Sequence, residues 1–290
     1  MSLDYKEIKD FDLDRAKDIE ESIRKKFHKS IFSPFCKAIN EYKLLAPGDK
    51  IAVCISGGKD SMLLAKLFQE LKRHNKFEFG LEFIVMDPGY NQANRTLIES
   101  NARTLGIPVK IFESDIFENV VTIEKSPCYI CARMRRGHLY NFARSLGCNK
   151  IALGHHYDDV IETILMGMLY GAQVQTMMPK LKSTNFEGMQ LIRPLYYVRE
   201  KDIIAWAKYN NLKFLQCACK FTEQTTALEA NNEDKSKRKK IKKLIASLAK
   251  EDPQIEYNIF KSVENVNLST IISYKDKKNK KHNFLDDYKK

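Results

Sequence analysis

The sequence contains no hydrophobic run long enough to cross a membrane. Its longest apolar stretches, such as Ile161 to Tyr170, fall far short of the roughly 20 residues that a transmembrane helix needs. The first residues, MSLDYKEIKDFD, lack the cationic region and following apolar run of a secretory signal. We therefore expect a cytoplasmic protein with no membrane partner.

The sequence also lacks the composition of a disordered or disulfide-built protein. Apolar residues make up 43% of the 290 residues, which is enough for a substantial core in one main domain with appended segments. Seven cysteines in a reducing compartment do not predict a disulfide framework. The two close pairs, Cys128/Cys131 and Cys217/Cys219, are better interpreted as metal ligands or redox groups.

Acidic residues are too few to balance the basic ones, because 37 Asp and Glu stand against 49 Lys and Arg, a net charge of +12. Such an excess suits a polyanionic partner, although basic residues can also do no more than solvate a surface. The run Lys235 to Lys243 (KSKRKKIKK) leads into a predicted helix with one apolar face and one lysine-rich face. Its apolar residues are Ile241, Leu244, Ile245 and Leu248. The tail from Lys275 to Lys281 is expected to be mobile.

Short apolar runs alternate with helical patterns through the middle of the sequence. Ile51 to Ile55 (IAVCI) predicts a strand, and Met62 to Leu71 predicts a helix after a glycine-rich turn. The alternation continues with strands predicted at 81–86, 109–112 and 150–153 and helices near 94–105, 134–146 and 158–169. This order predicts an α/β fold with a parallel sheet and helices on both faces. Ligands bind such sheets beyond the carboxyl ends of the strands, so the loops at Ser56, Asp87 and Gly154 should line one site.

A candidate phosphate-binding loop, Ser56-Gly57-Gly58-Lys59-Asp60-Ser61, joins the first of these strands to its helix. Free N–H groups at a helix start favour an anion, and two glycines let the backbone approach it closely. Val53 stands where the triphosphate loop of kinases and GTPases needs a glycine. The hexapeptide instead resembles the PP-loop of the ATP pyrophosphatase superfamily, whose members split ATP into AMP and pyrophosphate.

Polar residues follow two later strands of the predicted sheet. Asp87 precedes Pro88-Gly89, and Gly154-His155-His156-Tyr157-Asp158-Asp159 follows the strand at 150–153. A carboxylate pair beside a triphosphate suits Mg²⁺, although Asp158 and Asp159 can also cap the helix after them. Either histidine can touch the ligand or orient the backbone. The residues expected at ATP and Mg²⁺, besides the hexapeptide, are Asp87, Gly154, His155 and Asp158.

The motif Cys128-Tyr129-Ile130-Cys131 is ambiguous by itself, because zinc, iron–sulfur clusters and redox dithiols all use this spacing. Its surroundings are more specific. CYICARMRRGHLY, ALGHHYDDVIET, MPKL and IRPLYYVREKDI follow SGGKDS in the order of the tRNA-cytidine 2-sulfurtransferase family (TtcA), which the sequence resembles from about Gly48 to Val266. The resemblance implies the adenine nucleotide alpha-hydrolase-like fold of PP-loop proteins.

The resemblance also implies a [4Fe–4S] cluster held by three cysteines. It assigns Cys128, Cys131 and Cys217 as the ligands. The family commonly has Pro-Cys-x-x-Cys at the third position, whereas this sequence reads Gln216-Cys217-Ala218-Cys219, so Cys219 competes for the role. Cys36 and Cys148 match no ligand position, and Cys54 is expected in the core.

The activity implied is adenylation of a nucleobase carbonyl oxygen by ATP, at C2 of an anticodon-loop cytidine, followed by replacement with sulfur and loss of AMP. Lys59, Arg135 and Asp159 are the expected catalytic residues, although Arg135 and Arg136 suit RNA phosphate equally well. The partners would be tRNA and a sulfur donor, either a cysteine desulfurase persulfide or sulfide, and a homodimer is left open.

Two other functions stay open at this point. A PP-loop enzyme could act on another target, such as a tRNA uridine or a small molecule, and the cysteines could form a structural zinc site in an RNA-binding protein. The expected organisation is a helical N-terminal segment (1–46), a PP-loop catalytic domain (47–220), and a basic helical segment with a tail (221–290).

Overall fold

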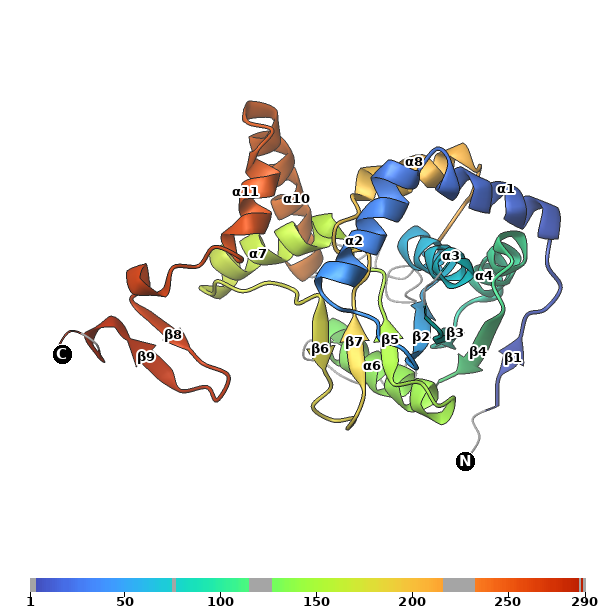
Figure 1. Cartoon of the computed structure of the whole chain (residues 1–290), viewed down its shortest axis with the longest axis horizontal. Helices are drawn as coiled ribbons and strands as arrows, with labels where there is room; N and C mark the ends of the chain where they lie inside the picture. The colour runs from blue at the N-terminus through green and yellow to red at the C-terminus, as the bar shows by residue number, and fades with distance from the viewer. Residues whose placement is uncertain (1–3, 75–76, 115–126, 216–232, 287, 289–290) are drawn as a thin grey trace. The chain divides into compact units, whose positions relative to one another are not determined.

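The strand predicted at Ile51–Ile55 is β2 (Lys50–Ile55), and it lies at the centre of a seven-stranded sheet (Figure 1). Ile51 and Val53 belong to one hydrophobic core, while Ala52 and Cys54 belong to another on the opposite face. Successive side chains of a strand point to opposite faces, so an apolar run throughout is what a strand buried on both sides requires. The computed structural model describes residues 4–74, 77–114, 127–215, 233–286 and 288.

The sheet has the strand order β1-β4-β3-β2-β5-β7-β6. The strands β3 (Gly80–Asp87), β4 (Val109–Glu113), β5 (Lys150–Ala152) and β7 (Gln190–Ile192) run parallel to β2. Two short outer strands, β1 (Lys6–Glu7) and β6 (Lys180–Lys182), are antiparallel. Since β3 and β5 lie on opposite sides of β2, the strand order reverses there, which is where open α/β sheets form a ligand crevice.

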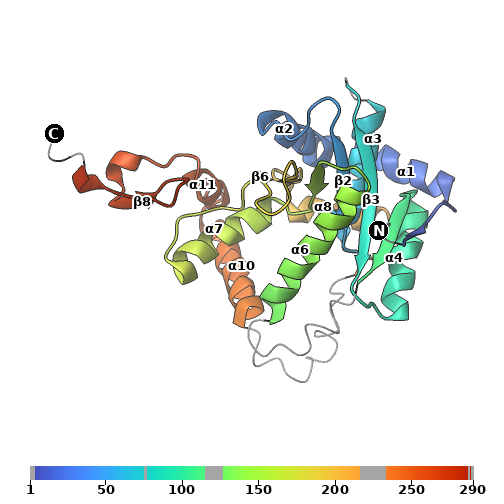
Figure 2. The same ribbon diagram turned by 90° about the horizontal axis from the view of Figure 1, so that it is seen from below.

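Helices cover both faces of this sheet, as predicted. The first core contains side chains from α1 (Leu13–Arg24), α2 (Ser33–Glu41), α3 (Lys59–Arg73), α4 (Gln92–Leu105) and α8 (Glu200–Tyr209), together with a π-helical turn at His28–Phe32. The second core packs against α6 (Pro127–Ser145), and Figure 2 shows α6 on the face away from α1, α3 and α4. Helix α6 begins well before the predicted residue 134.

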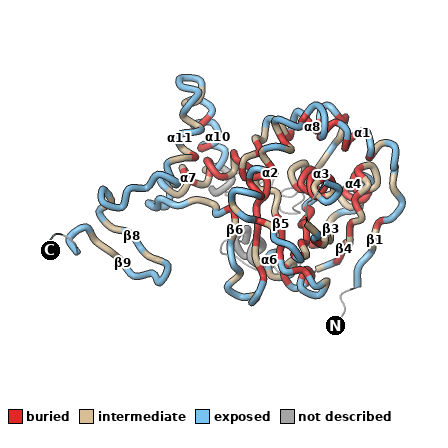
Figure 3. Tube along the Cα trace, viewed as in Figure 1, coloured by how far each residue is buried: buried red, intermediate tan, exposed pale blue. Residues whose placement is uncertain are grey.

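Buried residues gather along the strands of the sheet and on helices that cover it (Figure 3), and they include charged residues. Lys66 in α3 is 0% exposed, and its ammonium donates to Glu20 Oε1 at 2.6 Å and to the Leu105 carbonyl at 2.8 Å. Lys150 in β5 similarly donates to Asp49 Oδ2 at 2.5 Å and to the Leu44 carbonyl at 2.8 Å. These pairs connect the N-terminal helical region to the sheet layer.

The chain divides into two compact units, and the sheet belongs to the unit formed by residues 1–160 and 178–232. The other unit, residues 161–177 and 233–290, contains most of α7 (Tyr157–Gly171), α10 (Glu233–Glu251) and α11 (Ile255–Ser262). Ile241 and Ile245 of α10 are buried, as predicted, whereas Leu244 is 40% exposed. None of the described helices is long and apolar enough to span a bilayer.

The segment expected as a mobile tail instead forms a hairpin, in which β8 (Ser273–Lys275) pairs with β9 (Lys281–Asn283). Asp276 organises the turn, because its Oδ1 accepts the backbone N–H groups of Lys278 at 2.8 Å and Lys280 at 3.0 Å. Two short 3-10 turns, Leu268–Thr270 and Phe284–Asp286, flank the hairpin. The lysine-rich composition of this segment suggested a mobile tail. The turn depends instead on its one aspartate, Asp276.

Candidate active site

The loop from Ser56 to Ser61 joins β2 to α3 at the point where the strand order reverses. Gly57 has φ +84°, and a Cβ there would lie 2.8 Å from side-chain carbons of both Ile98 and Leu215. Gly58 is the N-cap residue of α3 and has no side chain to cover the first N–H groups of that helix. These groups are therefore available to an anion, as the sequence predicted.

The two serines of the loop differ in what they do. Ser61 is buried, and its Oγ accepts the Ser56 N–H at 3.1 Å and donates to the Gly58 carbonyl at 3.0 Å. Ser61 therefore fixes the curvature of the loop. Ser56 is exposed, and its hydroxyl lies 3.2 Å from Ser61 Oγ, so it is the serine that can reach a bound phosphate.

The loop after β5 packs directly against the first turn of α3. A Cβ on Gly154 would lie 3.0 Å from the carbonyl carbon of Asp60 and 3.0 Å from the Ser61 nitrogen. Real Cβ contacts are seldom so short, so glycine is required for this approach. The loops at Ser56 and Gly154 are therefore in contact, and their shared binding site with the Asp87 loop stays a prediction.

Charged side chains cluster at this junction. Lys59 Nζ lies 3.2 Å from Asp60 Oδ1 and 3.2 Å from Glu200 Oε1. Burial lowers the pKa of Lys59, but the charges of Asp60 and Glu200 outweigh it and hold that pKa above its usual value. Burial raises the pKa of Asp60, although His156 and Lys59 oppose the shift. Asp60 Oδ1 is buried and, apart from its ion pair with Lys59, has no partner that meets hydrogen-bond geometry among the described residues.

Asp87 ends β3, as expected, but its carboxylate is occupied by protein groups. Its Oδ1 accepts the N–H groups of Gly89 at 2.9 Å and Tyr90 at 2.7 Å, and its Oδ2 is paired with Arg95. The side chain thus shapes the turn after β3. Contact between Asp87 and ATP stays a prediction.

The two acidic residues that open α7 have different partners. Asp159 Oδ2 accepts the His156 N–H at 3.1 Å, while His156 Nδ1 lies 3.4 Å from the Asp159 nitrogen, which resembles a capping box. Asp158 instead accepts the Glu200 N–H at 2.7 Å and pairs with Arg199 Nη2 at 2.9 Å, so it caps α8. The capping role is therefore present, and the Mg²⁺ role stays a prediction.

Sequence reasoning assigned no role to Arg199 and Glu200, although both lie in the quoted segment IRPLYYVREKDI. Glu200 contacts Lys59, and Arg199 contacts Asp158, so the start of α8 joins the nucleotide loop to the start of α7. The sequence feature that could have indicated these contacts is the pair of opposite charges, Arg199 and Glu200, at the start of a predicted helix. His155 lies in the loop between β5 and α7, as its sequence position required.

The first two candidate cluster ligands lie on the first turn of α6, because that helix begins at Pro127. Cys128 and Cys131 are three residues apart and therefore share a helix face. Their side chains and that of Arg135 lie outside the described residues, as do Cys217 and Cys219 entirely. Leu215, just before this last segment, donates its N–H to the Gly57 carbonyl at 3.2 Å. The side chains that are described include no group of three His, Cys, Asp or Glu arranged to hold a metal.

Comparison with known proteins places this site in a family. The PP-loop domain family matches residues 23–247. A tRNA-cytidine(32) 2-sulfurtransferase of Coxiella burnetii (strain RSA 493 / Nine Mile phase I) is 33% identical over 257 residues, which cover 86% of this chain and 94% of the relative. One of Neisseria meningitidis serogroup C is 40% identical over 186 residues, which cover 62% of this chain and 57% of the relative, so the match spans little more than half of that protein.

The fold has a solved counterpart. The U34-tRNA thiolase NcsA from Methanococcus maripaludis, solved with its [4Fe-4S] cluster, matches with a TM-score of 0.62 and 22% identity, covering 81% of this chain and 79% of that one. This likeness supports the α/β architecture predicted from the alternating strands and helices. The chain belongs to the PP-loop family and, within it, to the family of the tRNA-cytidine 2-sulfurtransferases.

Proposed function

We propose that the protein is an ATP-dependent tRNA sulfurtransferase that replaces a nucleobase carbonyl oxygen, at C2 of an anticodon-loop cytidine, with sulfur. One observation carries the proposal. The SGGKDS loop lies where the strand order reverses. The chain that carries it matches a tRNA-cytidine(32) 2-sulfurtransferase over 94% of that relative's length. An anion-binding loop and this family relationship together favour adenylation of tRNA over simple ATP hydrolysis.

The reaction has two steps, and neither changes an oxidation state when the sulfur arrives as sulfide. The base O2 attacks the α-phosphorus of ATP, the bond from that phosphorus to the bridging oxygen breaks, and pyrophosphate leaves. Sulfide then attacks C2, the C2–O bond breaks, and AMP leaves with the original oxygen. The oxygen of a carbonyl is a poor leaving group until it is joined to phosphate, which is why ATP is needed.

ATP fits the residues described at the crevice. The first N–H groups of α3 suit its phosphates, and no side chain at Gly58 or Gly154 obstructs them. Lys59 stays protonated at neutral pH because Asp60 and Glu200 raise its pKa, so it can stabilise negative charge on the phosphates. The buried Asp60 Oδ1 suits a metal ion brought with the nucleotide, and Mg²⁺ prefers such oxygen ligands.

The cysteine set suits a [4Fe–4S] cluster with one iron not held by protein. Cys128 and Cys131 share a helix face, and Cys217 follows two residues after Leu215, whose N–H is bonded to the nucleotide loop. When bound, such a cluster supplies the iron at which sulfur is delivered. Arg135, on the same helix, and Asp159 would act on the developing charge and on protons at the base.

The unit that contains α10 would bind tRNA together with the crevice. Exposed lysines on α10, including Lys239, Lys240 and Lys243, suit RNA phosphates. A cytoplasmic location, a sulfur donor that is a desulfurase persulfide or sulfide, and a homodimeric assembly belong to the same proposal.

The decisive experiment is anaerobic purification followed by iron, sulfide and zinc analysis and a thionucleoside assay on tRNA. We expect iron and acid-labile sulfide in near-stoichiometric amounts, and ATP-dependent formation of 2-thiocytidine with release of AMP and pyrophosphate. Zinc alone after anaerobic reconstitution would favour a structural zinc site, and 2-thiouridine would identify a different target base.

The third ligand is tested by a matched pair of variants. Cys217→Ser should lose both the cluster absorbance and thiolation, whereas Cys219→Ser should retain most of each. If only Cys219→Ser is inactive, the ligand assignment is wrong and the enzyme class survives. If both variants are inactive, a fourth thiolate is required and the mechanism with an open iron fails.

A further inference from the structure

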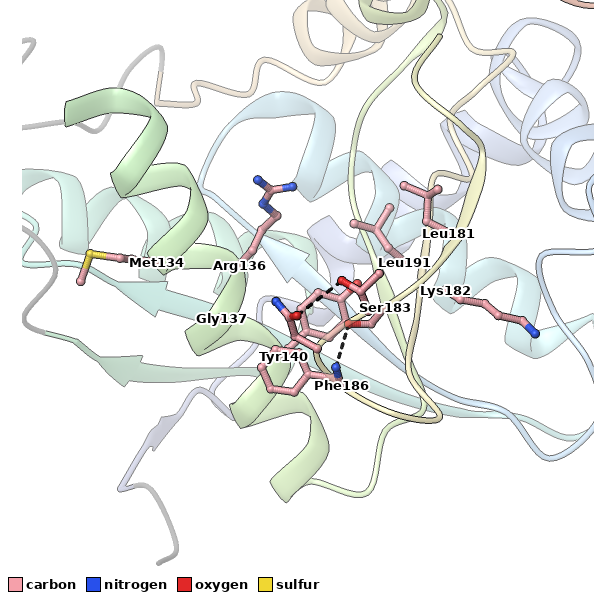
Figure 4. Close-up of a pocket in the computed structure, with 11 residues that line it drawn as sticks. Met134, Arg136, Gly137, Tyr140, Leu181, Lys182, Ser183, Phe186 and Leu191 are labelled. Atoms are coloured by element: carbon pink, nitrogen blue, oxygen red, sulfur yellow. Dashed lines mark hydrogen bonds between the residues drawn. The ribbon is translucent and has the colours of Figure 1, made fainter. Parts of the chain in front are cut away.

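A pocket whose lining includes no residue of the nucleotide loop lies between α6 and the hairpin formed by β6 and β7 (Figure 4). Its volume is about 920 Å³, within the upper part of the range of roughly 300–1,000 Å³ that small-molecule sites occupy. Arg136 and Tyr140 of α6 line one side, and Ser183, Thr184 and Phe186 of the hairpin line the other.

The chemistry of this pocket suits an anionic ligand with polar groups. Arg136 is exposed and contributes a guanidinium, while Ser183, Thr184 and Asn185 contribute two hydroxyls and an amide. None of the described residues that line the pocket carries a carboxylate. The pocket therefore attracts negative charge and can hydrogen-bond a neutral polar ring or sugar.

An aromatic pair joins α6 to the hairpin. Tyr140 and Phe186 stack with their ring centroids 4.9 Å apart and their planes 10° apart. Tyr140 is buried and Phe186 is only partly so, and the Phe186 N–H is fixed by Ser183 Oγ at 3.1 Å. A partly exposed ring held in one orientation is a suitable platform for a nucleobase.

A buried cation close to the pocket points to the same ligand class. Leu191 of β7 lines the pocket, and Arg193 follows it by two residues, directly after the end of that strand. Arg193 is 8% exposed, and its Nη1 donates to the Met178 carbonyl, whereas its Nε has no hydrogen-bond partner in the described part of the chain. Burial lowers its pKa to about 10, and Tyr140 and Arg136 lie close enough to influence that pKa. A buried cation with an unsatisfied donor and no ion pair among the described residues is stabilised when an anion comes near it.

We propose that this pocket binds a nucleotide of the RNA substrate that neighbours the modified base, with its phosphate toward Arg136 and its base against Phe186. The inference rests on the proposed function and extends it to a second contact. Cys131 and Arg136 both belong to α6, and their backbones are separated by about 7.5 Å along the helix axis.

The test measures the affinity for an unmodified tRNA transcript without ATP, at several salt concentrations. Arg136→Ala should weaken binding about 10-fold and reduce the slope of log affinity against log salt by roughly 1, because one phosphate contact is lost. Arg144→Ala is the matched control, since it removes the same charge from an exposed position on the same helix outside the pocket. We expect the control to bind as the wild type does.

A second variant tests the base contact separately. Phe186→Leu keeps an apolar side chain but removes the ring, so binding should weaken at least about 5-fold with an unchanged salt slope. Thermal unfolding of each variant should match the wild type, which excludes misfolding as the cause.

Three outcomes would overturn the proposal. They are wild-type affinity and slope in Arg136→Ala, an equal loss in the Arg144→Ala control, and slower pyrophosphate release in Arg136→Ala with unchanged tRNA affinity. The last would assign the pocket to ATP chemistry. If the wild-type protein itself neither binds nor thiolates tRNA, the proposed function fails, and that result is distinct from all three.

Discussion

Lysine is used in opposite ways in the two compact units. In the sheet-containing unit, Lys66 and Lys150 are buried, and each donates to a carboxylate and to a backbone carbonyl. In the other unit, Lys239, Lys240 and Lys243 lie on the exposed face of α10, whose opposite face buries Ile241 and Ile245. The overall charge of +12 thus combines lysines that hold the fold with lysines that are available to a polyanion.

The position of a lysine in the fold, and not the number of lysines, decides what its charge does. Burial lowers the pKa of Lys66 even though Glu20 opposes the shift, so its protonated state depends on the pair. An exposed lysine has no such dependence. The first kind of lysine should therefore affect stability when it is changed, and the second kind should affect RNA affinity.

The largest expected effect concerns the nucleotide loop, which should affect chemistry without affecting RNA affinity. Asp60→Ala and Ser61→Ala should each reduce ATP-dependent thiolation by at least about 100-fold, because they alter the phosphate site. Cluster absorbance and tRNA affinity should be unchanged. Product analysis by chromatography provides a further check, since release of ADP in place of AMP and pyrophosphate would mean that the loop has another function.

The next largest effect should be the loss of stability when the buried Lys66 is changed. Lys66→Met leaves Glu20 without one of its two cationic partners, Lys66 and Arg73, and should lower the free energy of unfolding by about 3 kcal/mol. Lys25→Met, which removes an exposed ion pair with Glu21, should cost less than about 1 kcal/mol. Urea denaturation of both variants measures the difference, and equal effects would contradict the distinction drawn between the two kinds of lysine.

The exposed lysines of α10 should affect RNA affinity and leave stability nearly unchanged. Changing Lys239, Lys240 and Lys243 to Glu together should weaken tRNA binding by at least about 10-fold in moderate salt, with little change in thermal stability. A control with the same change in net charge is Lys17→Glu, Lys37→Glu and Lys72→Glu, on exposed positions of α1, α2 and α3. A similar loss of affinity in this control would mean that total charge, and not α10, determines binding.

The smallest effect should appear in the pH dependence of stability. Burial raises the pKa of Asp49, but Lys150, Asn149 and the Ala46 N–H outweigh it, so the folded-state pKa lies below the unfolded value of 3.8. Such a group stabilises the fold above pH 3.8 and loses this contribution as the pH falls through the folded-state pKa. Asp49→Asn should therefore flatten the acid side of the profile below pH 3.8, measured by urea denaturation from neutral pH to about pH 2. An unchanged profile would exclude Asp49 as a source of acid sensitivity.

The sequence was sufficient where one physical pattern determined the structure. The apolar run at β2 predicts a buried strand with a helix after it, and Gly57 predicts a tight turn with close packing, and these features are present. The capping of α8 by Asp158 was not predictable, because its partners are 41 and 42 residues away. Strand β1 has only two residues and no periodicity to detect.

The strand order also determines the sequence in which the sheet can be completed during synthesis. The central strand β2 is made before both of its neighbours, so β3 and β4 can be added on one side as they leave the ribosome, and β5 and β7 later on the other. Strand β1 is made first of all but pairs with β4, so Lys6 must wait until Ile111 has been translated. Of the seven strands, β1 therefore waits longest for its first partner, and it can be bound by chaperones or cut by proteases on the nascent chain during that interval.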